Sequence, residues 1–162
     1  MKIVIFTLLI AIIVSCDGGL KPEPESRSYL TGNIIFTNSI EDWAPADSLY
    51  DLRVVAFKNF PPEDVILEVL GGQAYFTPDS LEYYVKNVSF TLEIPDAPVE
   101  LKYIAVAQQY DSVLTSWRAV GVYSESGDNT KHSSIFIEKG ETKEISITVD
   151  FKDLPPQPFK LD

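Results

Sequence analysis

The side chains that could support catalysis are few in this sequence and follow no known catalytic pattern. His132 is the only histidine, and Ser133 and Ser134 follow it directly. A serine nucleophile needs its hydroxyl held on an imidazole nitrogen and a third group that orients the ring, and neighbours in sequence rarely meet in that way. The chain has no Gly-x-Ser-x-Gly elbow and no Gly-rich loop that ends in Lys-Ser or Lys-Thr. We therefore expect no catalytic residue, no cofactor and an exposed loop position for His132.

Acidic side chains offer two other kinds of site, and neither has a distinctive pattern. The chain holds 24 Asp and Glu residues against 13 Lys and Arg residues. A pair of carboxyl groups can run glycoside hydrolysis, but nothing marks one pair as buried. Calcium needs about six to eight oxygen ligands, and the loop aspartates lack an Asp-x-Asp-x-Asp spacing. These aspartates are Asp42, Asp47, Asp51, Asp111 and Asp128. We predict a solvated acidic surface and no metal site.

The first sixteen residues have the pattern of a secretory signal peptide. They read MKIVIFTLLIAIIVSC, so Lys2 precedes a mainly apolar run over 3–14. That run is too short to span a bilayer as a helix, which takes about 20 residues. It fits the apolar part of a signal peptide, which has roughly 7–15 residues.

The single cysteine stands where a lipid-attachment pathway would need it. Ile13-Val14-Ser15-Cys16 resembles the lipobox of bacterial lipoproteins. The resemblance implies that the signal peptide, residues 1–15, is removed and that Cys16 carries diacylglycerol and a fatty acyl group such as palmitate. Two or more acyl chains anchor a protein stably, since each buried methylene contributes about 0.8 kcal/mol. We expect a protein of the bacterial cell envelope, periplasmic or on the outer surface, that the lipid on Cys16 holds to a membrane.

Composition divides the rest of the chain into a tether, a domain and a tail. Residues 16–28 hold the lipidated cysteine and a stretch rich in Gly, Pro, Glu and Ser, which is typical of an extended tether. Residues 29–154 predict one domain. Residues 155–162 predict a Pro-rich tail that either rests on its own domain or serves as a ligand for an aromatic groove. The formal net charge of −11 excludes nucleic acid as a partner.

Alternation of apolar and polar residues is the main structural signal. It is strict over 87–94 and 144–151, which predicts strands with one buried face, as in antiparallel sheets. Six further segments predict strands because they are rich in β-branched and aromatic residues. These segments are 29–36, 52–58, 73–76, 101–110, 117–123 and 134–138. Together they predict an all-β fold.

Two local expectations follow from helix and turn chemistry. At most one short helix is predicted, near 62–70, because Pro61 and Pro62 precede the acidic pair at 63–64 and Gly71-Gly72 follow it. A strand is the alternative. In that helix Val65, Ile66, Val69 and Leu70 would share one face. Lys139-Gly140-Glu141 predicts a hairpin between the last two strands.

Eight short strands in one domain predict an antiparallel two-sheet sandwich. Three segments resemble strands of the prealbumin-like, or carboxypeptidase-regulatory-like, sandwich of bacterial surface and periplasmic proteins. They are Leu30-Thr31-Gly32-Asn33-Ile34, Arg53-Val54-Val55-Ala56-Phe57 and Tyr103-Ile104-Ala105-Val106-Ala107. The resemblance implies a prealbumin-like topology, and an immunoglobulin-like sandwich has almost the same pattern.

Trp43 is the candidate ligand-binding residue. It lies in a long polar loop, TNSIEDWAPADS, between the first two predicted strands. Loops at the end of a sandwich carry binding residues, and tryptophan is enriched at binding hot spots. The alternative is that Trp43 folds back as a lid over the core. Trp117, at the start of a strand, is expected to belong to the core.

The function expected from these features is that of a non-catalytic binding or accessory module. Its partner would be an unknown envelope protein or a glycan, in addition to the membrane that the lipid on Cys16 enters. Two alternatives are an envelope hydrolase that uses dispersed carboxylates and a purely structural subunit of an envelope complex.

Overall fold

The computed structural model describes residues 26–62 and 64–158. The predicted signal peptide, Cys16 and most of the predicted tether lie outside these residues. The described residues form nine strands, one α-helix and two 3-10 turns. The strands are β1 (Tyr29–Phe36), β2 (Asp51–Phe57), β3 (Ala74–Phe76), β4 (Asn87–Glu93), β5 (Val99–Leu101), β6 (Tyr103–Gln109), β7 (Trp117–Val122), β8 (Ile135–Ile137) and β9 (Thr142–Val149). The helix is α2 (Val65–Leu70), and the turns are η1 (Ile40–Asp42) and η2 (Ala46–Ser48).

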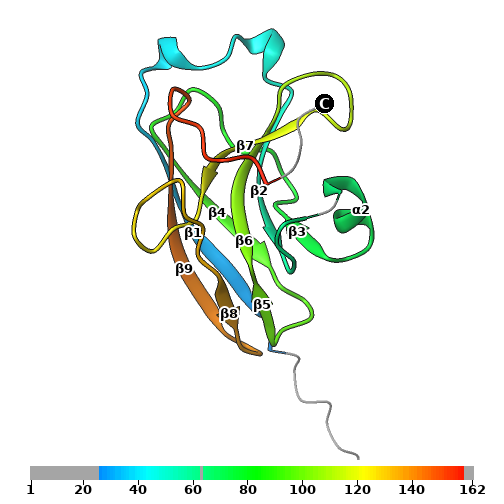
Figure 1. Cartoon of the computed structure of the whole chain (residues 1–162). Helices are drawn as coiled ribbons and strands as arrows, with labels where there is room; N and C mark the ends of the chain where they lie inside the picture. The colour runs from blue at the N-terminus through cyan, green and yellow to red at the C-terminus, as the bar shows by residue number, and fades with distance from the viewer. Residues whose placement is uncertain (1–25, 63, 159–162) are drawn as a thin grey trace, which may run out of the picture.

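Seven strands form one large sheet, and β5 and β8 form a small second one (Figure 1). The order in the large sheet is β3-β2-β6-β7-β9-β1-β4. The prediction of an all-β fold is confirmed. Neighbouring strands are antiparallel except β1 and β9, which run parallel. The expectation of a wholly antiparallel arrangement is therefore wrong at this pair, because alternation reports which face is buried and not the direction of the neighbouring strand.

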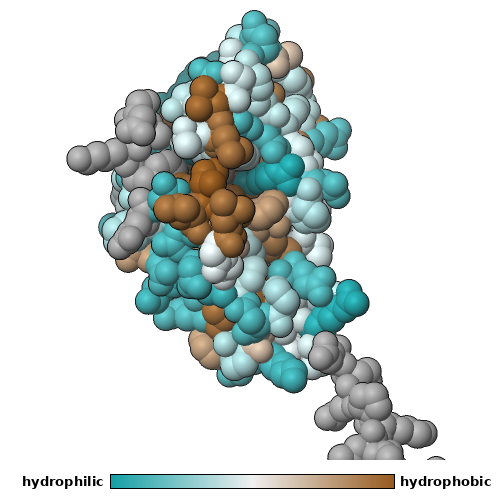
Figure 2. Space-filling view, turned by 90° about the vertical axis from the view of Figure 1, so that its right-hand side faces the viewer, coloured by the Kyte–Doolittle hydropathy of each residue, from teal (hydrophilic) through white to brown (hydrophobic). Residues whose placement is uncertain are grey.

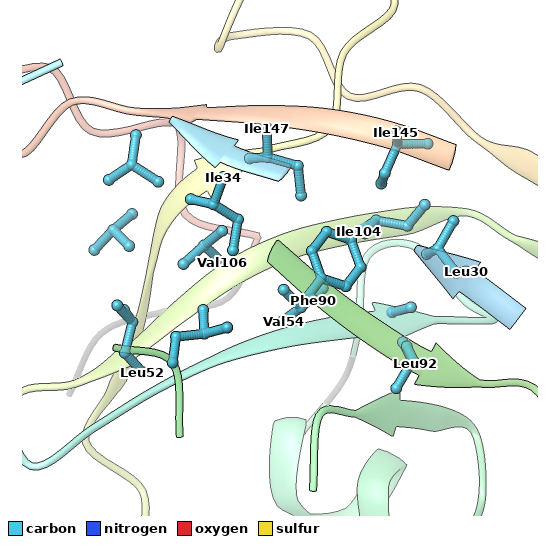
Figure 3. Packing of buried hydrophobic residues seen from close by; sticks show 14 of the residues in the cluster. Leu30, Ile34, Leu52, Val54, Phe90, Leu92, Ile104, Val106, Ile145 and Ile147 are labelled. Atoms are coloured by element: carbon cyan, nitrogen blue, oxygen red, sulfur yellow. The ribbon is translucent and has the colours of Figure 1, made fainter. Parts of the chain in front are cut away.

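The main hydrophobic core is built from both halves of the large sheet. Figure 3 shows side chains from β1, β4 and β9 meeting those from β2 and β6. In β9, Ile145, Ile147 and Val149 are buried while the residues between them are exposed. The alternation in this part of the sequence therefore places one face of the strand in the core.

β2 and β6 are buried on both faces. Val54 and Val106 belong to the main core, whereas Val55 and Ala105 belong to a second buried cluster on the opposite face. α2 covers part of that outer face and packs Val65 against the second cluster. Strands covered on both sides have near-continuous apolar sequences, which explains why 52–58 and 101–110 show no alternation.

The predicted short helix is confirmed as α2. Its first turn is capped by Asp64, whose Oδ1 accepts a hydrogen bond from the Leu67 backbone N–H at 2.9 Å. The expected apolar face is wrong at Leu70, which is 77% exposed. One residue turns an α-helix by about 100°, so Leu70 lies on the outer flank while Val65 and Val69 face the sheet.

The large sheet changes direction between β7 and β9, which share a single residue pair, Gly121 with Val149. A Cβ on Gly121 would lie 2.7 Å from Val149 Cγ2 and 2.8 Å from the Thr148 carbonyl oxygen. Only glycine permits so close an approach of two strands. The group β3-β2-β6-β7 consequently lies across the main core from the group β9-β1-β4.

The prediction of a hairpin at 139–141 is wrong, because β8 and β9 do not pair with each other, although the turn between them is present. The Glu141 N–H donates to the Glu138 carbonyl oxygen at 3.1 Å, and Gly140 has a φ of 78°. β8 pairs with β5, while β9 pairs with β1 and β7. Turn residues reverse the chain locally but do not determine which strands then pair.

Val149→Asp and Thr148→Asp form a matched test of this core. Val149 is fully buried and its neighbour Thr148 is exposed. We expect Val149→Asp to lower the free energy of unfolding by several kcal/mol, because it places an unpaired charge in the core. Thr148→Asp should change it by only about 0.5 kcal/mol. Urea denaturation followed by circular dichroism measures both, and equal effects would contradict the assignment of the buried face.

Candidate functional site: an apolar groove beside α2

Trp43 is buried and closes one end of the core. Its exposed fraction is 6%, and its ring lies 4.5 Å from that of Phe36, 4.9 Å from Phe151 and 5.4 Å from Tyr84. These are the distances of aromatic rings that pack together. The exposed indole on which the ligand-binding prediction depended is absent, and the burial matches the lid alternative.

Contacts on both sides of Trp43 hold the lid in place. Lys152 Nζ lies 2.7 Å from Asp42 Oδ1, and the Tyr84 hydroxyl donates to the Ala44 carbonyl oxygen at 3.1 Å. The loop is thus joined to the segments after β9 and before β4. A long polar loop can therefore bury a tryptophan that its sequence places at the surface.

His132 lies in an exposed loop, as expected, and its ring packs on other aromatic rings. The ring centroid is 3.9 Å from Phe60 and 5.6 Å from Tyr103. The neighbouring Ser133 hydroxyl accepts a hydrogen bond from the Glu125 backbone N–H at 3.0 Å. The imidazole thus has an aromatic environment, and the adjacent serine is engaged by a backbone group.

The loop aspartates do not converge on a common site. Within residues 26–62 and 64–158, no group of three or more His, Cys, Asp or Glu side chains is placed to hold a metal ion. A hydrogen bond from Thr130 lowers the pKa of the Asp128 carboxyl to about 2, and a hydrogen bond from Lys152 lowers the pKa of Asp42. Hydrogen bonds to the ionised form favour the carboxylate, so these groups are ionised surface acids held by neighbouring side chains.

An apolar groove of about 190 Å³ lies on the outer face of β2, β6 and β7 and is bounded by α2. Small side chains at Ala105, Ala107 and Ala119 line it, and they leave the space that larger residues would fill. The remaining lining side chains are Arg53, Val55, Phe57, Val65, Ile66, Val69, Phe76, Tyr103, Leu114 and Trp117. An apolar cavity of about 150 Å³ is enough to hold a benzene molecule, so this groove has room for a large apolar side chain.

Arg53 is the one charged side chain in the lining, and its charge is neutralised locally. Its Nε donates to Asp51 Oδ2 at 2.6 Å, and its Nη1 donates to the carbonyl oxygens of Thr77 and Pro78 at 2.6 and 2.7 Å. These bonds tie the guanidinium to the segment after β3. The groove therefore offers its occupant hydrophobic surface with little polar recognition.

Tyr103 lies at the other end of the groove and also borders a smaller hollow beside His132. Its hydroxyl is buried and has no hydrogen-bond partner among the described residues. Burial raises the pKa of this hydroxyl, because the phenolate would lose its hydration. Tyr103 is therefore a neutral side chain that separates the two hollows.

Exposed apolar side chains are also present on α2 and in the loop before β7, the elements that bound the groove. Figure 2 faces the side of the molecule on which α2 lies and shows a continuous hydrophobic band. Leu114 lines the groove at its rim and is 64% exposed. Outside the lining, Val113 is 54% exposed, and Leu67 and Leu70 on α2 are 68% and 77% exposed. Contiguous apolar surface of this kind is uncommon on soluble domains and marks interaction sites.

Trp117 lines this groove, is half-buried and belongs to neither buried cluster, so the expectation that it is a core residue is wrong. Sequence reasoning missed the groove because its residues come from five separate elements, β2, α2, β3, β6 and β7, and from the loop before β7. The available signal was the pair Ala105 and Ala107 in a strand that is apolar on both faces. Small residues on an outer face leave a hollow when a helix only partly covers them.

The described part of the Pro-rich tail rests on its own domain. Pro155 is buried, and the Gln157 side chain makes two hydrogen bonds to the backbone of Ala119 in β7. Its Oε1 accepts from the Ala119 N–H at 2.8 Å, and its Nε2 donates to the Ala119 carbonyl oxygen at 2.9 Å. The first of the two alternatives for the tail therefore holds for 155–158.

Comparison with known proteins gives no relative of this chain. No family model matches it, and neither the curated proteins nor the solved structures contain a match. Within the described part of the chain, no helix is long and apolar enough to cross a membrane.

Replacement of each tryptophan by alanine distinguishes the lid from the groove. Trp43→Ala should lower the free energy of unfolding by about 3–5 kcal/mol, because it leaves a cavity among aromatic rings. Trp117→Ala should cost about 1 kcal/mol, because its ring already borders open space. Urea titrations measure both values. A larger loss for Trp117→Ala than for Trp43→Ala would contradict these positions.

Proposed function

We propose that this protein is a lipid-anchored β-sandwich of the bacterial cell envelope that binds a partner protein and catalyses no reaction. The anchor rests on the lipobox pattern that ends at Cys16, which lies outside the described residues. The observation that carries the binding role is the apolar groove, whose lining includes the exposed Leu114, with the exposed Leu67 and Leu70 on α2, which bounds it. The tether would place this surface near the membrane, within reach of other envelope proteins.

The sandwich description is supported by the junction at Gly121 and Val149. A single residue pair joins β7 to β9, and the two groups of strands on either side of it face one another across the main core. Two facing groups of strands with a shared core fit the arrangement of a sandwich. For this sandwich we infer a prealbumin-like topology, with an immunoglobulin-like one as the alternative.

A protein partner fits the groove better than a glycan does. Sugars are bound through hydrogen bonds from polar side chains, and the one charged side chain of the lining, Arg53, already bonds Asp51 and two carbonyl groups. Leu114 at the rim, and Leu67 and Leu70 on α2, add exposed apolar surface outside the volume of the groove. A protein that inserts an apolar side chain into the groove and covers the rim would use both features.

The hydrolase alternative has less support. A general acid needs a carboxyl group whose pKa is raised, typically by burial. Asp42, Asp128 and Asp150 have pKa values lowered by hydrogen bonds. The structural-subunit alternative would use the same rim, but a hollow lined with small side chains favours an inserted side chain over a flat contact.

The anchor can be tested by the intact mass of the protein extracted from membranes with detergent. We expect a chain that begins at Cys16 and exceeds the peptide mass by fatty acyl weight. Cys16→Ala should leave an uncleaved precursor. A mature protein that retains Met1, or one that leaves the membrane without detergent, would contradict the anchor.

The groove can be tested by photo-crosslinking in the native envelope. A benzophenone amino acid at position 114, on the rim, should give one defined protein adduct. The same amino acid at position 40 should give none, because Ile40 is comparably exposed, at 62%, but does not line the groove. Ala107→Phe should fill the groove and abolish the adduct without changing the melting temperature. The control variant Ala46→Phe should form the same adduct as the unaltered chain. Equal adducts from positions 114 and 40 would refute the site.

A further inference from the structure

β4 is the last strand in the order of the large sheet, and one of its edges pairs with no strand among the described residues. Two hydrogen bonds fix the orientation of its backbone: the Phe36 N–H donates to the Lys86 carbonyl oxygen at 2.9 Å, and the Ile94 N–H donates to the Ser28 carbonyl oxygen at 2.8 Å. Both bonds follow the antiparallel register of β4 with β1. In such a ladder alternate residues bond the neighbouring strand, so the even-numbered residues of β4 face β1.

The odd-numbered residues of β4 therefore direct their N–H and C=O groups away from β1. They are Asn87, Ser89, Thr91 and Glu93. Among the described residues, none of these backbone groups bonds another strand. Natural edge strands are usually short, or carry proline, lysine or a bulge that prevents pairing. β4 has seven residues, no proline and no lysine, so its edge is able to accept another strand.

A slot of about 490 Å³ lies beside this edge of β4. One wall is formed by the consecutive residues 88–91, which places the slot beside the backbone of β4. The opposite wall is the segment 77–82. That segment is fixed to β2, because the Thr77 N–H donates to the Val54 carbonyl oxygen at 3.0 Å and the Leu81 N–H to the Leu52 carbonyl oxygen at 2.7 Å. The slot thus lies between two fixed walls.

The charge of the slot selects among possible occupants. Asp79, Glu82 and Glu93 line it, and no lysine or arginine does. Glu93 lies 3.8 Å from Arg27, which stands outside the lining. A second copy of the chain would bring the same acidic residues to the contact, and like charges facing each other are unfavourable. A strand with basic side chains would be attracted instead.

We propose that this slot binds an extended, basic segment of a partner protein, which adds to the large sheet as a strand beside β4. The backbone groups of the odd-numbered residues would supply the hydrogen bonds of this strand addition. Lysine or arginine side chains of the guest would face Asp79 and Glu82. The site is separate from the groove beside α2 and does not depend on the function proposed for that groove.

The test uses the full chain with Cys16→Ser in nonionic detergent and a fluorescent peptide, VKVKVKV, of the same length as β4. Fluorescence anisotropy should show saturable binding that weakens as salt is added. A matched peptide with every second amide N-methylated should bind at least roughly tenfold more weakly, since it cannot donate to the edge. The acidic peptide VEVEVEV should bind more weakly by a similar factor.

Two protein variants locate the binding. Thr91→Pro removes one outward N–H without breaking a bond to β1, so it should weaken VKVKVKV binding roughly fivefold with an unchanged melting temperature. Thr91→Val, which keeps the N–H, should bind as the unaltered chain does. Asp79→Lys with Glu82→Lys should weaken binding of VKVKVKV and strengthen binding of VEVEVEV.

Several results would overturn the proposal. They are equal binding of the N-methylated peptide, no binding at millimolar peptide, or no effect of the Thr91→Pro and charge-reversal variants. A dimer of the chain that Thr91→Pro dissociates would assign the edge to a second copy instead. Ala107→Phe should leave peptide binding unchanged, which separates a failure at this edge from a failure at the groove.

Discussion

The contact of Gly121 with Val149 is the constraint on which the rest of the architecture depends. Because β7 meets β9 at one residue pair, the large sheet changes direction there and encloses the main core with strands from both of its halves. The same change of direction leaves the outer face of β2, β6 and β7 without a second sheet over it. α2 covers only part of that face, and the groove is the part left uncovered. The far end of the sheet, at β4, has an edge that pairs with no other described strand.

Sequence patterns predicted the elements better than their partners. The strict alternation of 87–94 and 144–151 located β4 and β9, because each has one buried face. Capping signals located α2. β5 was not predicted as a separate strand, because only Lys102 separates it from β6 and the predicted strand 101–110 crosses that boundary. The parallel pairing of β1 with β9 could not be predicted, because contacts between distant segments leave no local pattern.

The candidate site shows that residue type and loop position alone do not predict which tryptophan is exposed. Trp43 has the sequence environment of an exposed loop residue, yet packing against Phe36 and Phe151 buries it. Trp117 begins a strand, yet its ring borders the groove, because the residues around it on that face are small. Which aromatic ring meets solvent is decided by the layers that the chain stacks over it. That information lies in the tertiary fold.

The pairing of Gln157 with Ala119 bears on where the folded unit ends. A side-chain amide carries one acceptor and a donor in the arrangement of a peptide group, so Gln157 does for one residue of β7 what a neighbouring strand would do. Glutamate at this position would lack the donor, and leucine would lack both groups. The composition boundary near residue 154 therefore falls inside the cooperative unit. The Pro-rich stretch is therefore part of the folded domain. Its removal would leave the N–H and C=O groups of Ala119 in β7 without these hydrogen bonds.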